Sequence, residues 1–347
     1  MKIVHFVYID KFTIGYINFM KIKFPQHQHY FFVWPPKRSI KLAHDESIYH
    51  VKSWKELYFD SEIKSILKAA DKIIITGMFG IQSKLLYMPS WFTQKTYIQF
   101  WGGDFYRFRE KKWHLSKLKT HIFLKRCHGF INLIKEDRKS LYSVFPIEKK
   151  CFIAPVPSDP KQNIDYLNYP IKRTSTSIKI LVGNSATEAN QHMEAYDILS
   201  KFKDENIEIF SPLSYGSEKY RDQVISYGRK IYGDKFHPLT QFMPLHDYVD
   251  FLSSIDVGIF NNNRQQALGN ISALLALGKK VYIRNDTSMW NSLKEMGFHI
   301  ENILVIPHFT LKNLVSISKD EIGENKKAYK HYRDQAISQW DTVFEDK

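Results

Sequence analysis

The chain has 347 residues, 44% of them hydrophobic and 25% charged, which is the balance of a globular protein with room for about two domains. A net charge of +14 favours an anionic partner, such as a nucleotide, a nucleic acid or a phospholipid surface. The two cysteines lack metal-ligand spacing, which argues against a zinc site. No apolar run approaches the ~20 residues that cross a bilayer, so we expect a chain in the cytosol or lying on a membrane.

The first half alternates apolar runs of strand length with helical patterns, which predicts an α/β domain with a parallel sheet. A dinucleotide-binding domain would carry G-x-G-x-x-G after its first strand, but the continuation here, DKFTIGYINF, has a single glycine. This argues against a nicotinamide or flavin cofactor. The expected strands are 2–9, 30–34, 72–76, 95–100, 129–133 and 151–154, and the expected helices are 61–70, 85–91 and 136–142.

The motif WGGDFY follows one of these predicted strands. The paired glycines Gly102 and Gly103 would let the backbone approach a ligand closely. Asp104 would then project into a crevice, flanked by Trp101 and Tyr106, as a general base or an acceptor for a sugar hydroxyl. The alternative is an aspartate that caps the next helix.

A basic segment, Arg107–Arg126, comes next and contains a single acidic residue. Its apolar residues recur at roughly helical spacing, which predicts a cationic amphipathic helix. Such a helix suits an anionic membrane surface, at about 1 kcal/mol per cation near the lipid. The alternative is an ordinary surface helix whose apolar stripe packs on the sheet. The stripe comprises Trp113, Leu115, Leu118, Ile122 and Phe123.

Composition predicts the domain boundaries. The stretch PVPSDPKQNIDYLNYPIKRTSTS, residues 155–177, is rich in proline, asparagine and serine and lacks periodicity, which is typical of a linker, and we place the linker at 161–176. We therefore expect an N-terminal domain at 1–160, a second domain at 177–325 and a charged terminal helix at 326–347.

The second half opens with a predicted strand that runs into the small-residue turn Gly183, Asn184 and Ser185. A helix start after such a turn is a common phosphate-binding geometry. Tyr215 lies in a later loop and could stack on a base, although loop aromatics more often serve packing. The expected strands are 178–182, 207–210, 255–260, 281–283 and 303–306, and the expected helices are 188–199, 218–232, 245–253, 271–277 and 290–296.

The segment IDVGIFNNNRQQALGNISALLALGKKVYI predicts a βαβ unit whose polar loop lies at the carboxyl end of a strand, where such sheets bind ligands. Arg264 adds a planar cationic fork, and the helix start near Gly269 and Asn270 offers unpaired backbone N–H groups. Together they predict a seat for a diphosphate. The alternative is a surface loop with solvated amides.

Three motifs carry a resemblance to a known family. WGGDFY, ILVGNSATEANQH and NRQQALGN resemble WGxDLY, ILVGNSxxxxNxH and xRQQGxGT of the bacterial TDP-N-acetylfucosamine:lipid II N-acetylfucosaminyltransferases, glycosyltransferase family 56. The order and spacing match, and a weaker likeness runs from about residue 70 to about residue 300. In the third motif the family's first glycine is Ala267 or Leu268 here, and its threonine is Asn270.

The resemblance, with the two α/β halves, implies the GT-B architecture: two Rossmann-like parallel-sheet domains facing across a cleft, the first for the acceptor and the second for the nucleotide-sugar. It implies transfer of a deoxy-amino sugar, such as 4-acetamido-4,6-dideoxygalactose, from a dTDP-sugar to a polyprenyl-diphosphate-linked saccharide. The family acts peripherally at the cytoplasmic face of the bacterial inner membrane, in synthesis of enterobacterial common antigen or O-antigen. By their place in the motifs, the further donor-site candidates are Asn190, His192, Gln265 and Gln266.

Breaking the sugar–phosphate bond puts negative charge on the leaving diphosphate. The likely loops lack a D-x-D carboxylate pair, so Arg264, the helix start and the turn at 183–185 are expected to stabilise that charge, with no metal and no other cofactor. Asp104 would take the acceptor's proton in an inverting reaction or position the acceptor in a retaining one. Other possibilities are a transferase using a UDP- or GDP-sugar, or a basic nucleic-acid- or membrane-binding protein without catalysis. No nucleic acid is expected, because the basic residues cluster on one helix.

Overall fold

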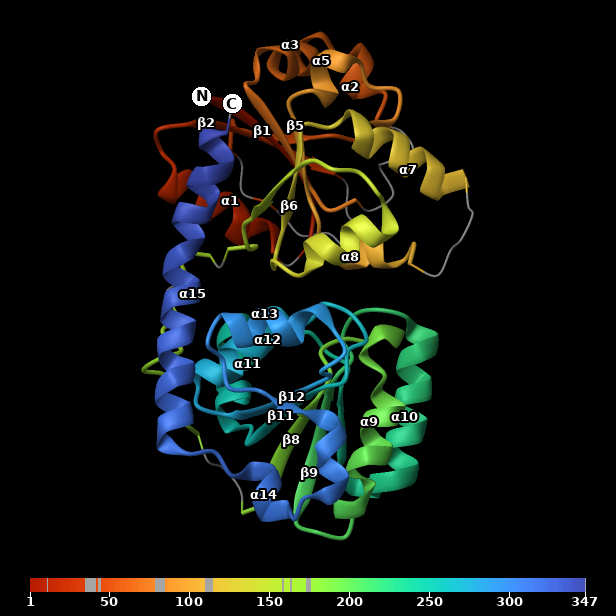
Figure 1. Ribbon diagram of the computed structural model, residues 1–347, viewed down its shortest axis with the longest axis vertical. Helices are drawn as coiled ribbons and strands as arrows, with labels where there is room; N and C mark the ends of the chain where they lie inside the picture. Colours follow the sequence, from red (N-terminus) through yellow and green to blue (C-terminus); the bar gives the residue numbers. More distant parts are fainter. Residues whose placement is uncertain are drawn as a thin grey trace. The chain divides into compact units, whose positions relative to one another are not determined.

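The computed structural model describes residues 1–10, 12–34, 42, 45–78, 85–109, 115–157, 159–162, 164–172 and 176–346. The chain divides into two compact units, unit 1 (Met1–Asn163 and Asp334–Lys347) and unit 2 (Ile164–Arg333). Each unit is a parallel β-sheet covered by helices (Figure 1). The chain leaves unit 1 within the predicted linker and returns to it within the long helix α15 (Lys319–Glu345).

The sheet of unit 1 has the order β3-β2-β1-β4-β5-β6-β7 with all neighbours parallel. Its central strands are apolar along almost their whole length, as expected for strands covered on both faces. The strands are β1 (Lys2–Tyr8), β2 (Gln28–Trp34), β3 (Ile48–His50), β4 (Lys72–Thr76), β5 (Thr96–Gln99), β6 (Gly129–Asn132) and β7 (Lys150–Ile153).

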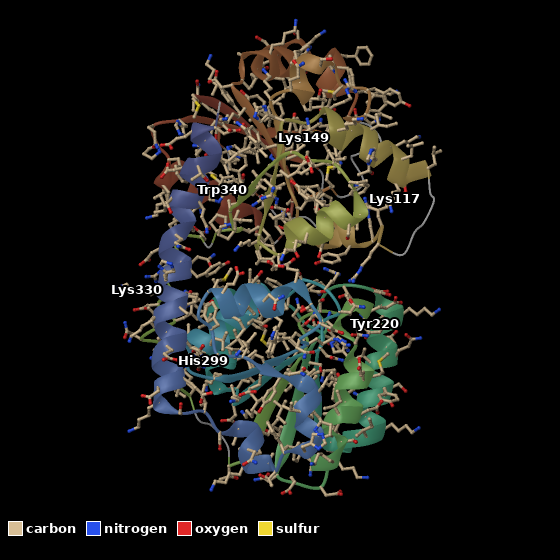
Figure 2. All side chains as sticks on the ribbon, viewed as in Figure 1. Lys117, Lys149, Tyr220, His299, Lys330 and Trp340 are labelled. Atoms are coloured by element: carbon tan, nitrogen blue, oxygen red, sulfur yellow. The ribbon has the colours of Figure 1, made fainter. Side chains whose placement is uncertain are left out.

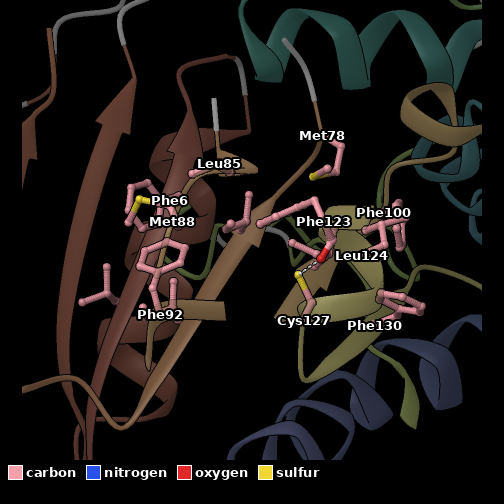
Figure 3. Packing of buried hydrophobic residues seen from close by; sticks show 14 of the residues in the cluster. Phe6, Met78, Leu85, Met88, Phe92, Phe100, Phe123, Leu124, Cys127 and Phe130 are labelled. Carbon is pink, nitrogen blue, oxygen red and sulfur yellow. Dashed lines mark hydrogen bonds between the residues drawn. The ribbon is translucent and has the colours of Figure 1, made fainter. Parts of the chain in front are cut away.

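Helices cover both faces of this sheet. One core contains Phe92, Phe123 and Leu124, which pack against β-strand residues such as Phe130, as Figure 3 shows. The opposite core contains residues of α1 and α15, including Trp340, whose place on α15 is marked in Figure 2. The helices are α1 (Thr13–Lys23), α2 (Glu56–Phe59), α3 (Ser61–Ala69), α5 (Ser90–Thr93), α6 (Gly103–Tyr106), α7 (Leu115–Arg126) and α8 (Asp137–Val144).

The sheet of unit 2 has the order β10-β9-β8-β11-β12-β13, also parallel throughout. Helices α9 and α10 cover one face, and α11, α12 and α13 cover the other (Figure 1). Gly258 permits the close approach of α12, because a Cβ there would lie 2.6 Å from Cδ1 of Leu274.

The strands of unit 2 are β8 (Ile178–Val182), β9 (Ile207–Pro212), β10 (Phe236–Leu239), β11 (Val257–Phe260), β12 (Lys280–Ile283) and β13 (Glu301–Asn302). Its α-helices are α9 (His192–Leu199), α10 (Glu218–Tyr232), α11 (Leu245–Ser254), α12 (Leu268–Ala276), α13 (Ser288–Glu295) and α14 (Leu311–Val315), with part of α15. Its 3₁₀ helices are η1 (Glu188–Asn190), η2 (Ser200–Phe202), η3 (Gly233–Lys235) and η4 (Ile303–His308).

Several sequence predictions were wrong in detail. A turn at 86–88 interrupts the helix expected at 85–91, and α5 begins only at Ser90, after Pro89 with its extended backbone. The strand expected at 303–306 is the 3₁₀ helix η4, because the Asn302 side chain accepts a hydrogen bond from the Leu304 backbone N–H (3.2 Å) and starts a helical turn. The last helix begins seven residues earlier than expected, at a capping box in which Ser318 and Glu321 exchange side-chain-to-backbone hydrogen bonds of 2.8 and 3.1 Å.

Candidate functional site

The strand order of unit 2 reverses between β8 and β11, which are adjacent and parallel although far apart in the sequence. Ligands of open α/β sheets bind beyond the carboxyl ends of the strands at such a switch point. The loops that leave β8 and β11 here carry the two predicted donor-binding segments, 183–187 and 261–267. We call these the β8 loop and the β11 loop.

Gly183 begins the β8 loop with a left-handed backbone, φ +72°. Its N–H donates to the carbonyl of Ile259 in β11 at 2.9 Å, which holds the loop against the neighbouring strand. A Cβ at this position would lie 2.4 Å from Nε2 of His192 and 3.0 Å from Oδ1 of Asn190. Glycine is therefore required both by the backbone conformation and by the close side chains.

Asn190 is fully buried and ties the two loops together. Its Oδ1 accepts hydrogen bonds from the backbone N–H of Asn184 (3.0 Å) and from Nδ2 of Asn262 (3.3 Å). Its Nδ2 donates to Oγ1 of Thr187 at 2.8 Å. Because these hydrogen bonds occupy its amide group, Asn190 holds the two loops together. This arrangement does not favour direct contact between Asn190 and a ligand.

The helix predicted at 188–199 is interrupted. Residues 188–190 form the 3₁₀ turn η1, Gln191 is left-handed with φ 47°, and α9 begins only at His192. This break lets Asn190 point back at the β8 loop. His192 is buried, its Nδ1 lies 3.3 Å from the hydroxyl of Tyr220, and burial lowers its pKa to about 3, so the imidazole is neutral.

Gln266 joins the β11 loop to the β8 loop. Its Nε2 donates toward Oγ of Ser185 (2.9 Å), Oδ1 of Asn184 (3.1 Å) and Oγ1 of Thr187 (3.1 Å). Asn184 in turn donates from Nδ2 to the hydroxyl of Tyr215 at 2.9 Å. The structure thus brings together five residues that the sequence motifs had placed in three separate stretches.

The start of α12 lies at the end of the β11 loop. Ala267 is its N-cap residue, has φ +62° and provides no side-chain cap within the described part of the chain. Gly269 is exposed, and no heavy atom of the described residues outside its own neighbourhood lies within 4 Å of a Cβ built there. Asn270 donates to the hydroxyl of Tyr248 at 2.9 Å. This helix end can offer backbone N–H groups to an anion.

Two further predicted residues flank this helix start. Arg264 is partly exposed and donates from Nη1 to the carbonyl of Gln265 at 3.1 Å. Gln265 is buried, and its Oε1 has no hydrogen-bond partner among the described residues. The loop therefore carries a guanidinium and an unsatisfied acceptor next to each other.

Sequence reasoning missed a second polar cluster at the same sheet edge. Nη1 of Arg284, which directly follows β12, lies 3.1 Å from both carboxylate oxygens of Glu194 on α9. Glu194 also accepts from Nδ2 of Asn261 at 2.9 Å. The signal was available, because Arg284 stands one residue beyond a predicted strand.

In unit 1 the expectation that Asp104 projects into a crevice was wrong. Asp104 is only 1% exposed, and its carboxylate accepts hydrogen bonds from the backbone N–H of Met78 (3.0 Å) and of Trp101 (3.1 Å). Burial raises the pKa of this carboxyl, and the backbone hydrogen bonds offset part of the rise. The side chain joins the loops that follow β4 and β5. It is not the helix cap either, since Gly102, with φ +85°, precedes α6.

The other residues of this motif surround that anchor. Gly103 begins α6, and Tyr106 ends it and donates from its hydroxyl to Oδ1 of Asp137 at 2.8 Å. Trp101 is partly exposed and packs edge-on against Phe12, with ring centroids 5.5 Å apart. The motif therefore builds a rigid corner at the carboxyl edge of the sheet.

The basic segment divides into three parts. Residues 107–109 end the turn after α6, residues 110–114 lie outside the described residues and include the predicted Trp113, and 115–126 form α7. Phe123 packs in the core, whereas Leu115, Leu118 and Ile122 are 65%, 43% and 41% exposed. The predicted apolar stripe therefore does not pack as one face.

The described residues hold no group of three or more histidine, cysteine or carboxylate side chains able to bind a metal ion. No helix among them combines the length and apolar character that crossing a membrane requires.

A family model described as 4-alpha-L-fucosyltransferase glycosyl transferase group 56 matches residues 70–338. Solved structures of low identity share the fold. A glycosyltransferase from Rickettsia africae ESF-5 has a TM-score of 0.67 and 14% identity, covering 99% of this chain and 97% of that one. WaaG, a glycosyltransferase involved in lipopolysaccharide biosynthesis, has a TM-score of 0.62 and 11% identity, covering 99% and 100%.

A third similar structure, the trehalose-6-phosphate structure from E. coli bound with UDP-2-fluoro glucose, has a TM-score of 0.64 and 10% identity and covers 99% and 98%. These proteins are GT-B glycosyltransferases, and the two parallel-sheet α/β units of this chain confirm the predicted GT-B fold.

Proposed function

The chain belongs to the 4-alpha-L-fucosyltransferase family, glycosyl transferase group 56, and from this premise we propose that it moves a deoxy-amino sugar from a dTDP-sugar to a polyprenyl-diphosphate-linked saccharide. It is a hexosyltransferase with the GT-B fold. The proposed sugar is of the N-acetylfucosamine type, such as 4-acetamido-4,6-dideoxygalactose. The proposed pathway is synthesis of a bacterial surface polysaccharide, either enterobacterial common antigen or O-antigen.

The observation that carries the proposed donor site is the cross-linking of the β8 and β11 loops by Gln266 and Asn190 at the switch point of unit 2. Hydrogen bonds fix the loops before any ligand arrives, so little ordering is needed on binding. The first turn of α12 and the guanidinium of Arg264 lie at the end of this scaffold. A diphosphate is the part of a nucleotide-sugar that suits such donors.

Transfer forms a bond between the acceptor's hydroxyl oxygen and the anomeric carbon and breaks the bond between that carbon and the phosphate oxygen. The electron pair stays on the leaving diphosphate, whose phosphate oxygen takes the hydroxyl proton. Arg264 and the backbone N–H groups at the start of α12 would stabilise this charge, at about 3–4 kcal/mol for each fixed donor. We propose that these groups suffice without a divalent ion. Turnover should therefore persist in excess EDTA, and a strict Mg²⁺ requirement for the chemical step would contradict this part of the proposal.

We propose a positioning role for Asp104 in place of the general base expected from the sequence. The carboxylate is 1% exposed and accepts hydrogen bonds from the backbone N–H groups of Met78 and Trp101, so it is placed to hold these loops and not to meet an acceptor hydroxyl. Its hydrogen bonds instead fix the corner that carries Trp101 and Tyr106, which we propose to contact the acceptor.

The function is tested with a panel of dTDP-, UDP- and GDP-sugars and an extracted lipid-linked acceptor, with the product read by mass spectrometry. We expect a product only with the dTDP-linked amino sugar. A product formed only from a UDP- or GDP-sugar would overturn the assignment of the dTDP-sugar as donor, but it would leave glycosyl transfer as the activity.

Arg264→Ala tests the donor site. Its matched control is Arg229→Ala, the same change at an exposed arginine on α10. We expect Arg264→Ala to weaken dTDP binding and to lower turnover about 100-fold or more, because it removes a donor to the leaving group. Arg229→Ala should match the unmodified chain. Equal turnover in both variants would remove Arg264 from the reaction.

We further propose that the enzyme lies peripherally on the cytoplasmic face of the inner membrane, through α7. Leu115, Leu118 and Ile122 are spaced three and four residues apart, so they share one side of this helix and are exposed there. Lys119 and Lys125 lie on the same helix. Exposed apolar groups among cations suit an anionic lipid surface.

Vesicle sedimentation tests this part separately. We expect binding to vesicles with anionic lipid and weaker binding to neutral ones. The double change Leu118→Ser and Ile122→Ser should reduce binding, whereas Phe242→Ser, which removes an exposed aromatic side chain from unit 2, should not. Binding unaffected by the α7 changes would refute this surface.

A further inference from the structure

A cluster of donor side chains lies at the amino edge of the unit 1 sheet, opposite the edge where ligands of such folds bind. Lys72 begins β4, Tyr97 is the second residue of β5, His128 immediately precedes β6, and Lys150 begins β7. Because the four strands are adjacent and parallel, their first residues meet at one edge. The proposed reaction uses none of these four side chains.

The group that occupies this cluster is the carboxylate of Asp346, which follows α15. It accepts hydrogen bonds from the hydroxyl of Tyr97 (2.7 Å) and from Nζ of Lys150 (2.6 Å), and it lies 3.0 Å from Nε2 of His128. Nζ of Lys72 donates to the backbone carbonyl of the same residue and to the hydroxyl of Tyr97 at 3.0 Å. The Asp346 side chain is 8% exposed.

The chemistry of the cluster is that of an anion pocket. Lys72 is buried, and a buried ammonium is costly unless it is paired. Nδ1 of His128 lies 3.0 Å from the carbonyl of Gln94, while its Nε2 faces the Asp346 carboxylate. A carbonyl and a carboxylate only accept, so both contacts are hydrogen bonds when both ring nitrogens carry protons.

Segment 334–346 contacts unit 1 through this cluster and through its own apolar side chains. Upstream of Asp346, the same helix buries Trp340, Val343 and Phe344 in the core that α1 shares. The apolar side chains bury surface of α15 against unit 1, whereas the carboxylate holds the end of the helix at one position. Release of the carboxylate would leave Lys72 buried without the backbone acceptor that it now has.

We propose that Tyr97, His128 and Lys150 form a carboxylate-binding pocket whose resident ligand is Asp346, and that this pocket, with Lys72 on the backbone carbonyl of the same residue, is a latch holding segment 334–346 on unit 1. The latch is independent of the donor site and of the proposed substrates. Its ligand class is a single carboxylate, which receives hydrogen bonds from a phenol, an ammonium and the Nε2–H of an imidazole ring.

The test uses the full chain and compares Asp346→Asn with Glu345→Gln, an equal change of charge at the exposed neighbouring residue. Hydrogen–deuterium exchange of peptides covering 336–346 is the readout. We expect exchange at least tenfold faster in Asp346→Asn and unchanged in Glu345→Gln. Tyr97→Phe, which removes one donor, should accelerate exchange about fivefold, the loss typical of one hydrogen bond. Equal exchange in Asp346→Asn and Glu345→Gln would overturn the latch.

Chemical rescue tests the pocket itself. In Asp346→Ala the pocket is vacated, and free acetate, which cannot tether the segment, should bind there and raise the thermal midpoint more than sodium chloride does at equal ionic strength. Circular dichroism before heating confirms that the variant is folded, and Asp346→Asn serves as the second variant if it is not. No difference between acetate and chloride in the folded alanine variant would show that the site does not recognise a carboxylate.

Discussion

Gly183→Ala should destabilise unit 2 more than a left-handed glycine alone explains. An L-residue in the left-handed region costs about 1–2 kcal/mol, and Gly183 has φ +72°. The added Cβ would also stand 2.4 Å from Nε2 of His192, far inside contact distance. Forcing apart a well-packed site costs about 1–3 kcal/mol more. The total expected loss in the free energy of unfolding is therefore about 2–5 kcal/mol.

Gly297→Ala is the control that isolates the steric part. Gly297 is also left-handed, with φ +85°, but the nearest atom to a Cβ there is Cβ of Ala328 at an ordinary 3.8 Å. In this variant the free energy of unfolding should fall only by the cost of the left-handed backbone, about 1–2 kcal/mol. Combining Gly183→Ala with His192→Ala should recover part of the steric loss, because the obstructing ring is gone. The effects of the two changes would then be non-additive.

Differential scanning calorimetry of five proteins provides the comparison, with dTDP titrations as a second readout: the unmodified chain, Gly183→Ala, His192→Ala, the double variant and Gly297→Ala. For a unit of this size, about 1–3 kcal/mol of extra destabilisation corresponds to a midpoint about 2–12 °C below that of Gly297→Ala. The affinity for dTDP should fall in Gly183→Ala only. Equal midpoints for the two single glycine variants, or additive losses in the double variant, would refute the packing of His192 against the loop.

Three further predictions rest on other features. Ala267→Gly should raise the free energy of unfolding by about 1 kcal/mol, because Ala267 has φ +62°; an unchanged or lower melting midpoint would contradict this. Burial lowers the pKa of His29 to about 4, so the unfolded state binds more protons between that pH and about 6.5, and stability falls as the pH drops through this window. The loss is about 3 kcal/mol for this residue, and His29→Gln should show a shallower dependence in urea titrations at pH 7 and pH 4.5. Asp104→Asn should lower the melting midpoint, with a loss of about 1–3 kcal/mol, since one neutral amide oxygen would have to serve both Met78 and Trp101 while the new NH2 group faces the Trp101 N–H, donor against donor. Its dTDP affinity should stay the same, and a normal midpoint would show that the hydrogen bonds are dispensable.

The strands were predictable because their signal is local. Most central strands of both sheets are short apolar runs bounded by turn residues, and the predicted limits of β4 and β8 match the structure. Helix α1 escaped detection because it is apolar on most sides, with Tyr16, Ile17 and Met20 all buried, and so lacks a polar face. Strand β3 has only three residues, too few for an alternating pattern.

The candidate site was predictable to the extent that one rule applies, namely that ligands of open parallel sheets bind beyond the carboxyl ends of the strands. That rule placed Asn184, Ser185 and Gln266 at one edge, and the structure joins them by direct hydrogen bonds. The burial of individual side chains could not be predicted from the motifs in the same way. Asn190 and Asp104 stand in the motifs like ligand-binding residues, but each is committed to backbone groups that tertiary contacts bring to it, from residues up to 26 positions away.

Helix α15 has a consequence for the order in which the protein is made. Residues 1–163 of unit 1 leave the ribosome before unit 2, yet the core of unit 1 is completed by Trp340, which is synthesised after all of unit 2. The apolar face of unit 1 beside α1 therefore stays uncovered until the end of α15 has been synthesised, while unit 2 folds. A nascent chain arrested before Trp340 should present that face to chaperones, even though unit 2 is already whole.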